Sequence, residues 1–338
     1  MKYRSTCYSD DGTIKYVFDT PIKGFNKTIG GSRDVGIESA LIHIPRRDDD
    51  KPEYILCLSS QIGCVYRCHM CANMFSSFYG CLTPAEIEKQ IKLTLSYDNN
   101  LEKIKSSGCV EYAFMAMGEP LYGHNVIMTI QEHKEHVPNT TFSLATAGAL
   151  GTIDKLTDSY LPYPTRLELS LHFTDDTIRR EWLEPDMWWF RKRPSLSISR
   201  MIEEAEKYVQ KYPGKVTLNY TLIDGVNNME HNIEELSKII KGQTDVFYVK
   251  VMKPNMTSSF LFSHKDECEW GRKSKRYNPN EFKDKLLEAG IPATLFESKG
   301  QDVSAGCGMM TTRVDGAKGI LFARDIIIPQ ADYSKSGF

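Results

Sequence analysis

Three closely spaced cysteines constrain this chain more than any other feature. Cys64, Cys68 and Cys71 follow the spacing C-x3-C-x2-C. Three thiolates at this spacing can hold three irons of a [4Fe–4S] cube and leave the fourth iron without a protein ligand. An open coordination position is typical of a catalytic metal site, whereas a structural site has all of its positions filled. The spacing therefore indicates a redox enzyme rather than a metal site that only stabilises a fold.

Zinc and disulfide bonds are the alternatives to an iron–sulfur cluster, and both are less favoured. A structural zinc site usually takes four ligands in two pairs, and the chain has no second C-x2-C pair. His69 lies between two of the cysteines, where it could hardly complete a tetrahedron without strain. Nine cysteines in 338 residues is an odd number and far below the density of a disulfide scaffold. We therefore favour the cluster, with zinc as the second possibility.

Length and composition fit an intracellular enzyme, and free thiols together with a cluster indicate a reducing compartment. Apolar residues make up 41% of the chain and charged residues 25%, both ordinary values for a water-soluble protein. No apolar run approaches the roughly 18 residues of a membrane span, and the first residues lack the apolar stretch of a secretion signal. We expect a cytoplasmic protein without a membrane partner. The net charge of −2 does not indicate a nucleic-acid binder, although a local basic patch is compatible with it.

Strand-like and helix-like segments alternate along the chain, which predicts βαβ units and a parallel sheet. Thr83 begins a strong helix signal, with Pro84 at the first helical position and Glu86 completing a capping box. About six β/α units fit a partial barrel better than a closed barrel of eight units. The predicted strands span residues 13–18, 39–44, 55–60, 110–117, 141–146, 167–172, 216–223, 246–252 and 293–297, and the further helices span 153–159, 200–212, 232–241 and 280–289.

Three parts of the chain are expected. They are a small β-rich extension over residues 1–50, a core over 51–312 and a C-terminal tail over 313–338. Within the core, residues 124–136 read as a polar segment. Ligands of parallel α/β folds gather at the carboxyl ends of the strands, and the cysteine triplet follows the first core strand. We therefore expect the site at that edge of the sheet.

The cluster spacing is that of radical S-adenosylmethionine (SAM) enzymes, and the wider pattern resembles the RlmN/Cfr family of radical SAM RNA adenine methyltransferases. The run CLSSQIGC at residues 57–64 is similar to that family's C-[VI]-S-S-Q-x-G-C. Similar motifs follow in the family's order at residues 117–120 (MGEP), 170–172 (SLH), 222–227 (LIDGVN), 254–255 (PN) and 300–308 (GQDVSAGCG). The resemblance covers roughly residues 8–312 and implies a partial (β/α)6 radical SAM barrel, with a [4Fe–4S] cluster and SAM as cofactors.

The resemblance also implies that two further cysteines carry a methyl transfer. Cys307 would take a methyl group from one SAM, and a radical made from a second SAM would remove hydrogen from it. The carbon radical would add to an adenine ring carbon, and Cys57 would then remove the ring proton and form a disulfide with Cys307. The residues implied to contact SAM are Gly118, Glu119, Ser170, Leu171, His172 and Asn255. The remaining cysteines, Cys7, Cys81, Cys109 and Cys268, are expected to be structural.

The chain departs from the family's pattern in several places. Ala145 stands where the family usually has a serine that contacts SAM, and Arg46 stands where an acidic residue is common. Met70 precedes the third cluster cysteine, where the family usually has an aromatic residue. The chain begins almost at the segment that follows the family's N-terminal helical RNA-binding domain. We therefore expect it to lack most of that domain.

Two basic segments could take the place of that domain. Residues 188–193 interleave aromatic rings with cations, as surfaces that stack nucleobases do, and residues 272–276 form a second basic run. The possible substrate contacts are Trp188, Trp189, Arg191 and Arg193. The expected partners are an RNA substrate (rRNA or tRNA) and an electron donor such as flavodoxin or ferredoxin. Two alternatives stay open: a radical SAM methyltransferase of a nucleotide-like small molecule or peptide, and a non-enzymatic iron–sulfur or zinc module that binds RNA.

Overall fold

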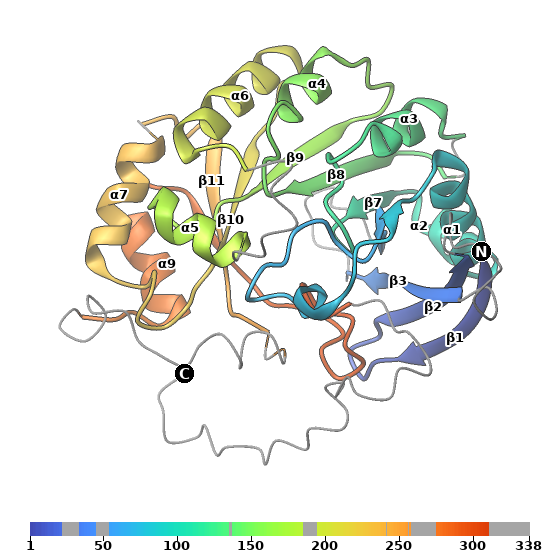
Figure 1. Cartoon of the computed structure of the whole chain (residues 1–338). Coiled ribbons are helices and arrows are strands. Elements are labelled where there is room, and N and C mark those ends of the chain that lie inside the picture. Colours follow the sequence, from blue (N-terminus) through green and yellow to red (C-terminus); the bar gives the residue numbers. More distant parts are fainter. Residues whose placement is uncertain are drawn as a thin grey trace.

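The computed structural model describes residues 1–21, 34–44, 54–134, 137–184, 195–240, 242–255, 257 and 275–310. Their strands form one large sheet in the order β1-β2-β3-β4-β7-β8-β9-β10-β11-β12, and a small sheet of β5 and β6. Since β1 and β12 are the edges of the large sheet, the described strands do not close into a ring (Figure 1). The strands are β1 (Lys2–Tyr8), β2 (Ile14–Pro21), β3 (Asp34–His43), β4 (Tyr54–Cys57), β5 (Gln61–Ile62), β6 (Gly80–Cys81), β7 (Val110–Phe114), β8 (Thr140–Thr146), β9 (Thr165–Ser170), β10 (Val216–Thr221), β11 (Phe247–Met252) and β12 (Ala293–Phe296).

All neighbouring strands from β4 to β12 in the large sheet pair in parallel. Every strand from β4 to β11 in this parallel part is followed by at least one helix, and β12 adds a further parallel strand. The prediction of an α/β fold with six β/α units in an open, mostly parallel sheet is therefore confirmed. The helices are η1 (Ala72–Phe75), α1 (Pro84–Ser96), α2 (Asn100–Ser107), α3 (Asn125–Glu132), α4 (Ile153–Asp158), α5 (Asp176–Leu183), α6 (Ile198–Lys211), α7 (Glu230–Ile240) and α9 (Pro279–Glu288).

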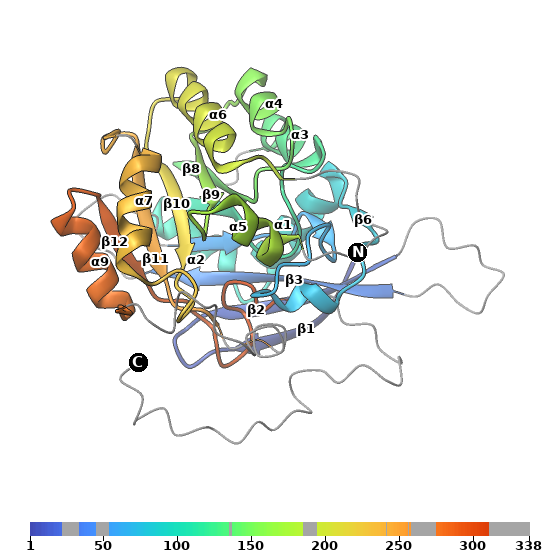
Figure 2. The ribbon, with the colours of Figure 1, turned by 60° about the vertical axis from the view of Figure 1, so that its left-hand side comes forward.

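The amino-terminal strands extend the same sheet in antiparallel fashion. β1 pairs with β2, β2 with β3, and β3 with β4, each time antiparallel. Figure 2 shows these three strands along one side of the molecule, where Asn100 of α2 donates to the hydroxyl of Tyr16 of β2 at 2.7 Å. They form the β-rich extension that the sequence predicts. The domain limits at residues 50 and 312 fall outside the described residues and stay predictions.

The two faces of the parallel strands differ in polarity. Along β9, Leu167 and Leu169 pack into the apolar core, and Glu168 between them points to the other face. There Glu168 accepts hydrogen bonds from Lys250 of β11 at 2.7 Å and from Asn219 of β10 at 3.1 Å. Since the helices lie along the outside of the curved sheet in Figure 1, the charged face is the inner one. The inner face of the parallel strands therefore carries buried polar side chains that bind one another.

The predicted start of α1 is confirmed in detail. The Thr83 side chain accepts a hydrogen bond from the backbone N–H of Glu86, and the Glu86 carboxylate accepts one from the backbone N–H of Thr83 at 2.8 Å. Pro84 occupies the first turn, where its missing N–H costs nothing. Ile87 and Ile91 then lie fully buried on one face of the helix.

Several short elements lie outside the sequence prediction. Residues 124–136 are expected to be a polar segment, but α3 forms there and buries Val126, Ile127 and Ile130. Its single apolar face is only two turns long, too short for a clear periodic signal. The strand β1 and the helices α2 and α5 are likewise additions to the prediction. Within the described ranges, no helix combines the length and apolar character that a bilayer crossing requires.

The capping box of α1 gives a test of the fold. Replacing Thr83 by Ala should lower the free energy of unfolding by about 1 kcal/mol, because the first turn loses its side-chain acceptor. Thr83→Ser keeps the hydroxyl and should stay close to wild type. Urea unfolding followed by circular dichroism measures both variants. Equal midpoints for Thr83→Ala and wild type would contradict the role of this cap.

Candidate active site

The segments that follow β4 and β7 are hydrogen-bonded to each other at the carboxyl edge of the sheet. The backbone N–H of Ser60 donates to the carbonyl of Met117 at 2.8 Å, and the side-chain oxygen of Gln61 accepts from the N–H of Glu119 at 3.1 Å. Gly118 has a φ of +105°, and a Cβ there would lie 2.6 Å from the Cβ of Gln61. The glycine of the MGEP motif is therefore needed so that this backbone can lie against residues 58–71, the cluster loop.

The three cluster cysteines lie together in the cluster loop. Cys64, Cys68 and Cys71 are free thiols, each partly buried. Burial raises the pKa of Cys64, and the neighbouring charges of Cys68 and Cys71 raise it further. Three such thiolates need nearby positive charge to stay ionised, and the irons of a cluster supply it.

In the described part of the chain, no three His, Cys, Asp or Glu side chains converge as they would around one metal ion. The ring of His69, the remaining zinc candidate, packs against Trp182 with 5.8 Å between ring centroids.

Glu119 is buried next to this loop and is already held by the protein. Its Oε1 accepts from the hydroxyl of Thr146 at 2.6 Å and from the N–H of Leu121 at 3.1 Å, and its Oε2 accepts from the N–H of Ala147 at 2.8 Å. Burial raises the pKa of the carboxyl, and these hydrogen bonds oppose the rise. Oε2 accepts fewer of these bonds than Oε1, and a carboxylate oxygen can accept two. Oε2 therefore keeps acceptor capacity within the described part of the chain, and the contact of Glu119 with SAM stays a prediction.

Sequence reasoning does not single out Arg179, yet it is the largest fully buried side chain among the described residues. Its guanidinium donates to the carbonyl of Ala147 at 2.6 Å after β8, and to those of Ser170 at 3.1 Å and Leu171 at 3.2 Å after β9. It also donates to the carbonyl of Leu196 at 3.2 Å. A charged residue on the buried side of an amphipathic helix, here α5, is the sequence signal that could have revealed it.

The SLH motif lies at the end of β9, as predicted, and Arg179 binds the backbone of its first two residues. His172 has a φ of +56°, and its Nδ1 accepts from the N–H of Thr221 at 3.1 Å. Burial and then the charge of Arg179 lower the pKa of His172 to about 3. The imidazole is therefore neutral near pH 7 and is held as a hydrogen-bond acceptor.

Cys57 and Cys307 are neighbours at the mouth of the barrel. Cys57 ends β4 and is buried, whereas Cys307 lies exposed in the segment of residues 298–310, the Cys307 loop. Burial raises the pKa of Cys57, and the charge of Cys307 is the next cause. The ammonium of Lys250 on the inner face of β11 acts against the rise in both thiols. The two cysteines thus share one electrostatic environment.

Asn255 holds the Cys307 loop. Its Nδ2 donates to the carbonyl of Cys307 at 2.7 Å and to the hydroxyl of Ser298 at 3.0 Å. The same hydroxyl accepts from the N–H of Cys307 at 3.0 Å. The contact of Asn255 with SAM stays a prediction, and in the structure its side chain binds the Cys307 loop.

Several predicted residues are not among those that the structure describes. The residues that lie outside the described part of the chain are Trp188, Trp189, Arg191, Arg193, Arg46 and the basic residues 272–274.

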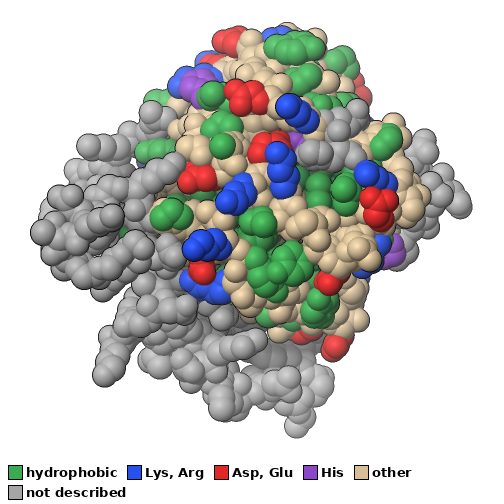
Figure 3. Space-filling view, turned by 90° about the vertical axis from the view of Figure 1, so that its right-hand side faces the viewer, with side chains coloured by type: hydrophobic (Ala, Val, Ile, Leu, Met, Phe, Trp, Pro, Cys, Tyr) green, Lys and Arg blue, Asp and Glu red, His purple; other side chains and the backbone are tan. Residues whose placement is uncertain are grey.

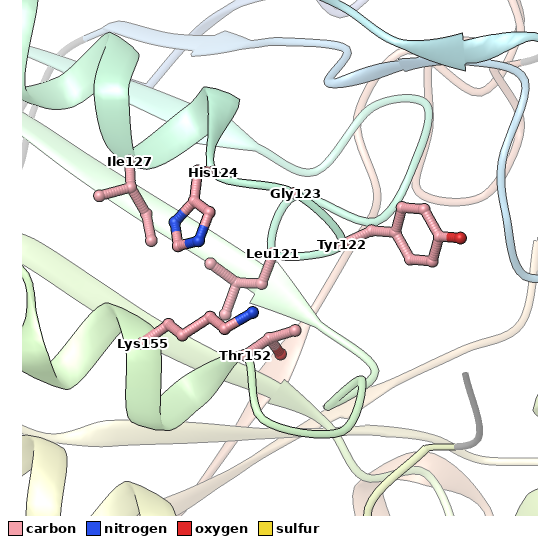
Figure 4. A pocket seen from close by; sticks show the side chains of 7 residues that line it. All are labelled: Leu121, Tyr122, Gly123, His124, Ile127, Thr152 and Lys155. Atoms are coloured by element: carbon pink, nitrogen blue, oxygen red, sulfur yellow. The ribbon is translucent and has the colours of Figure 1, made fainter. Parts of the chain in front are cut away.

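A small cavity of about 110 Å³ lies near the starts of α3 and α4 (Figure 4). None of its lining residues is a predicted site residue, since they are Leu121, Tyr122, Gly123, His124, Ile127, Thr152 and Lys155. It is a surface feature beside the site.

The model of the radical SAM superfamily matches residues 58–237, from the cluster loop into α7. The chain belongs to the radical SAM superfamily. This superfamily uses a [4Fe–4S] cluster and SAM, so the prediction of both cofactors is confirmed. Membership also favours the enzymatic interpretation over a zinc module. Cys64, Cys68 and Cys71 are the residues that would hold the cluster in this radical SAM chain, and that assignment stays a prediction.

Relatives of this radical SAM protein are methyltransferases. The dual-specificity RNA methyltransferase RlmN of Marinomonas sp. (strain MWYL1) is 27% identical over 309 residues, covering 89% of this chain and 74% of that protein. RlmN of Psychrobacter arcticus is 28% identical over 324 residues, covering 91% and 71%. The crystal structure of a radical SAM methyltransferase from Sphaerobacter thermophilus is 27% identical, with a TM-score of 0.68, over 91% of this chain and 80% of that chain. These matches place the chain among radical SAM methyltransferases.

Removal of one cluster cysteine should abolish iron binding. After anaerobic reconstitution, the wild type should hold about four irons per chain, whereas Cys68→Ala should hold almost none and should not cleave SAM. Cys109→Ala, at the opposite end of β7, is the matched control and should keep the iron of the wild type. Iron and sulfide analysis measures all three proteins. A full complement of iron in Cys68→Ala would remove this residue from the ligand set.

His172 should make stability depend on pH. Its pKa is about 3 in the folded chain and about 6.5 when unfolded, so the unfolded state binds the extra proton between these values. The stabilisation is complete above about pH 6.5 and is lost as the pH falls toward 3, with a slope of up to about 1.4 kcal/mol per pH unit. His172→Asn keeps an acceptor and tolerates the positive φ, and it should show a flatter profile.

Urea unfolding of the cluster-free protein between pH 7 and pH 4.5 measures this slope without a contribution from cluster loss. Parallel profiles for wild type and His172→Asn would show that the imidazole is not the titrating group.

Proposed function

We propose that this chain methylates an aromatic carbon of adenine in RNA, with Cys307 as the methyl carrier and Cys57 as the residue that resolves the covalent intermediate. The observation that carries the proposal is the pairing of these two cysteines at the mouth of a barrel whose cluster loop follows the same strand, β4. When bound, the cluster and SAM supply the methyl group and a radical that removes hydrogen from it. The thiol of Cys307 would carry the methyl group, and the thiol of Cys57 would resolve the covalent intermediate.

Cys307 suits the first role because it is exposed and Lys250 lies near it. A thiolate is the form that accepts a methyl group, and a nearby ammonium favours that form. Ser298 and Asn255 fix the backbone on either side of the thiol, so the S-methyl group has a defined position. The inner face of the barrel thus presents a carrier that can be loaded before the substrate binds.

Cys57 suits the second role because it is buried and lies within electrostatic reach of Cys307. Burial keeps it a thiol at rest, so it is protected from reaction until the intermediate forms. In the proposed step Cys57 first loses its own proton, and its thiolate takes the proton of the methylated ring carbon once the adduct radical has given up one electron. Cys57, again as a thiolate, then attacks the sulfur of Cys307 to form a disulfide. The electron pair of the broken carbon–sulfur bond stays on the methylene carbon, which takes up a proton and becomes the methyl group of the product.

The choice of RNA rests on the relatives. Both curated relatives are named dual-specificity RNA methyltransferases, and they align with about nine tenths of this chain. An adenine carbon between two nitrogens is not nucleophilic, which is why a carrier cysteine and a radical are needed at all. A small one-electron carrier such as flavodoxin or ferredoxin is proposed as the reductant, in the reducing cytoplasm.

The Cys57→Ala variant should trap the substrate. Without the resolving thiol, the thioether between Cys307 and the substrate is stable, so the variant should copurify with covalently bound RNA. Intact-mass and nuclease-digested peptide spectra detect the adduct, and sequencing of the attached nucleic acid identifies the target. Cys109→Ala is the matched control and should carry only a methyl group on Cys307.

The same trap distinguishes the alternatives. A nucleotide or peptide on Cys307 in place of RNA would replace the proposed substrate with a small molecule or a peptide. Absence of both methyl group and adduct, in protein that still cleaves SAM, would show that the cysteine pair is not catalytic.

A further inference from the structure

The Cys307 loop is tied directly to the residues that follow the last cluster cysteine. The backbone N–H of Ala72 donates to the carbonyl of Gly308 at 2.7 Å. The side-chain Nδ2 of Asn73 donates to the carbonyl of Met310, also at 2.7 Å. Both donors belong to η1, the short helix that begins directly after Cys71. The loop that carries one catalytic cysteine therefore rests on the segment that carries a cluster ligand.

The side-chain amide of Asn73 contacts both the Cys307 loop and the last cluster cysteine. The same Nδ2 lies 3.7 Å from the sulfur of Cys71, within reach of an N–H···S hydrogen bond. A carbonyl can only accept, so the contact with Met310 fixes which end of the amide carries the donors. Each of the two N–H groups then has one acceptor: the sulfur and the carbonyl.

Burying the polar side chain of Asn73 lowers the stability of the fold. The residue is 2% exposed, and within the described part of the chain its Oδ1 has no hydrogen-bond partner. A buried acceptor without a partner typically costs about 1–3 kcal/mol, and an apolar side chain of the same size would avoid that cost. The residue is therefore better explained by what its donors do than by packing.

The other end of the Cys307 loop is held by the amino-terminal strands. Asp11 accepts from the N–H of Gly300 at 2.8 Å, and Lys15 donates to the carbonyl of Ser304 at 3.0 Å. Asp302 accepts from the hydroxyl of Ser9 at 2.5 Å. These contacts fix the loop but do not touch the cluster cysteines. The loop thus has one tether that reaches a cluster ligand and another that does not.

We propose that Asn73 is a positioning residue that couples the cluster to the Cys307 loop. With the cluster bound, the sulfur of Cys71 holds one N–H of the amide and thereby orients the other toward Met310, so the loop is ordered when the cluster is present. Conversely, the N–H···S bond stabilises the added electron of the reduced cluster and raises its reduction potential. The proposal rests on the proposed role of Cys307 for its meaning in catalysis, but not for its test.

The test measures loop order and cluster potential separately. Hydrogen–deuterium exchange of residues 298–310 is followed in each protein with and without the reconstituted cluster, and the midpoint potential is determined by a titration monitored by electron paramagnetic resonance. In wild type, exchange of the loop should be slower with the cluster than without it. In Asn73→Ala, exchange should be the same in both states, and the potential should shift to a more negative value.

Two further variants separate the tethers. Asp11→Ala loosens only the amino-terminal tether, so exchange should be faster overall while the slowing by the cluster and the potential stay as in wild type. Asn73→Ser keeps a donor beside Cys71 but is too short for Met310. Its midpoint potential should stay near that of wild type, but the cluster should no longer slow exchange of the loop. If Asn73→Ala fails to bind iron, Asn73→Ser serves as the test.

The proposal would be overturned if the cluster slowed exchange of the loop in the Asn73 variants as much as in wild type, and if their midpoint potential also stayed at the wild-type value. A shift of potential in Asp11→Ala as large as in Asn73→Ala would also overturn it, because the effect would then come from the loop in general. Neither readout involves methyl transfer. A failure of the Cys57→Ala trap therefore leaves this result intact, and a failure here leaves the proposed reaction intact.

Discussion

The buried guanidinium of Arg179 is the interaction on which the rest of the site depends. Parallel strands end with carbonyl groups that point out of the sheet, and a rigid fork of donors can bind several of them at once. Arg179 binds those that follow β8 and β9 and one before α6. Ala147 can then present its N–H to Glu119, and the SLH segment keeps its sharp turn. A buried charge is costly, and these charge-assisted hydrogen bonds offset much of that cost.

Separation of polarity across the sheet decides where chemistry can take place. The helices cover the apolar face, so the polar groups of Glu168, Asn219 and Lys250 can lie only on the inner face. Such groups would be unstable in the interior of an ordinary core, and here Glu168 accepts hydrogen bonds from both Lys250 and Asn219. Burial is the main cause that raises the pKa of Cys57 and of Cys307, and the charges of Glu168 and Lys250 on these strands act on both thiols as well.

Local signals in the sequence were sufficient for the parallel strands β4 and β7 to β12 and for the start of α1, since strand-like runs and capping are short-range patterns. They failed for α3, whose two turns give too little periodicity, and for Arg179, whose partners come from three separate segments. The contacts of Asn255 were also beyond prediction, because they depend on where the Cys307 loop folds back. What the sequence could not provide is the meeting of segments that are distant along the chain.

The contact between Ser9 and Asp302 joins residues 293 positions apart, so the first strands and the Cys307 loop meet only after nearly the whole described chain has been made. Closing so long a loop is slow and comes after the local elements have formed. On the ribosome, the core of parallel strands can assemble while this contact is still impossible. A nascent or truncated chain then lacks a completed site. The Cys307 loop is therefore the last part of the described fold that can be completed during synthesis.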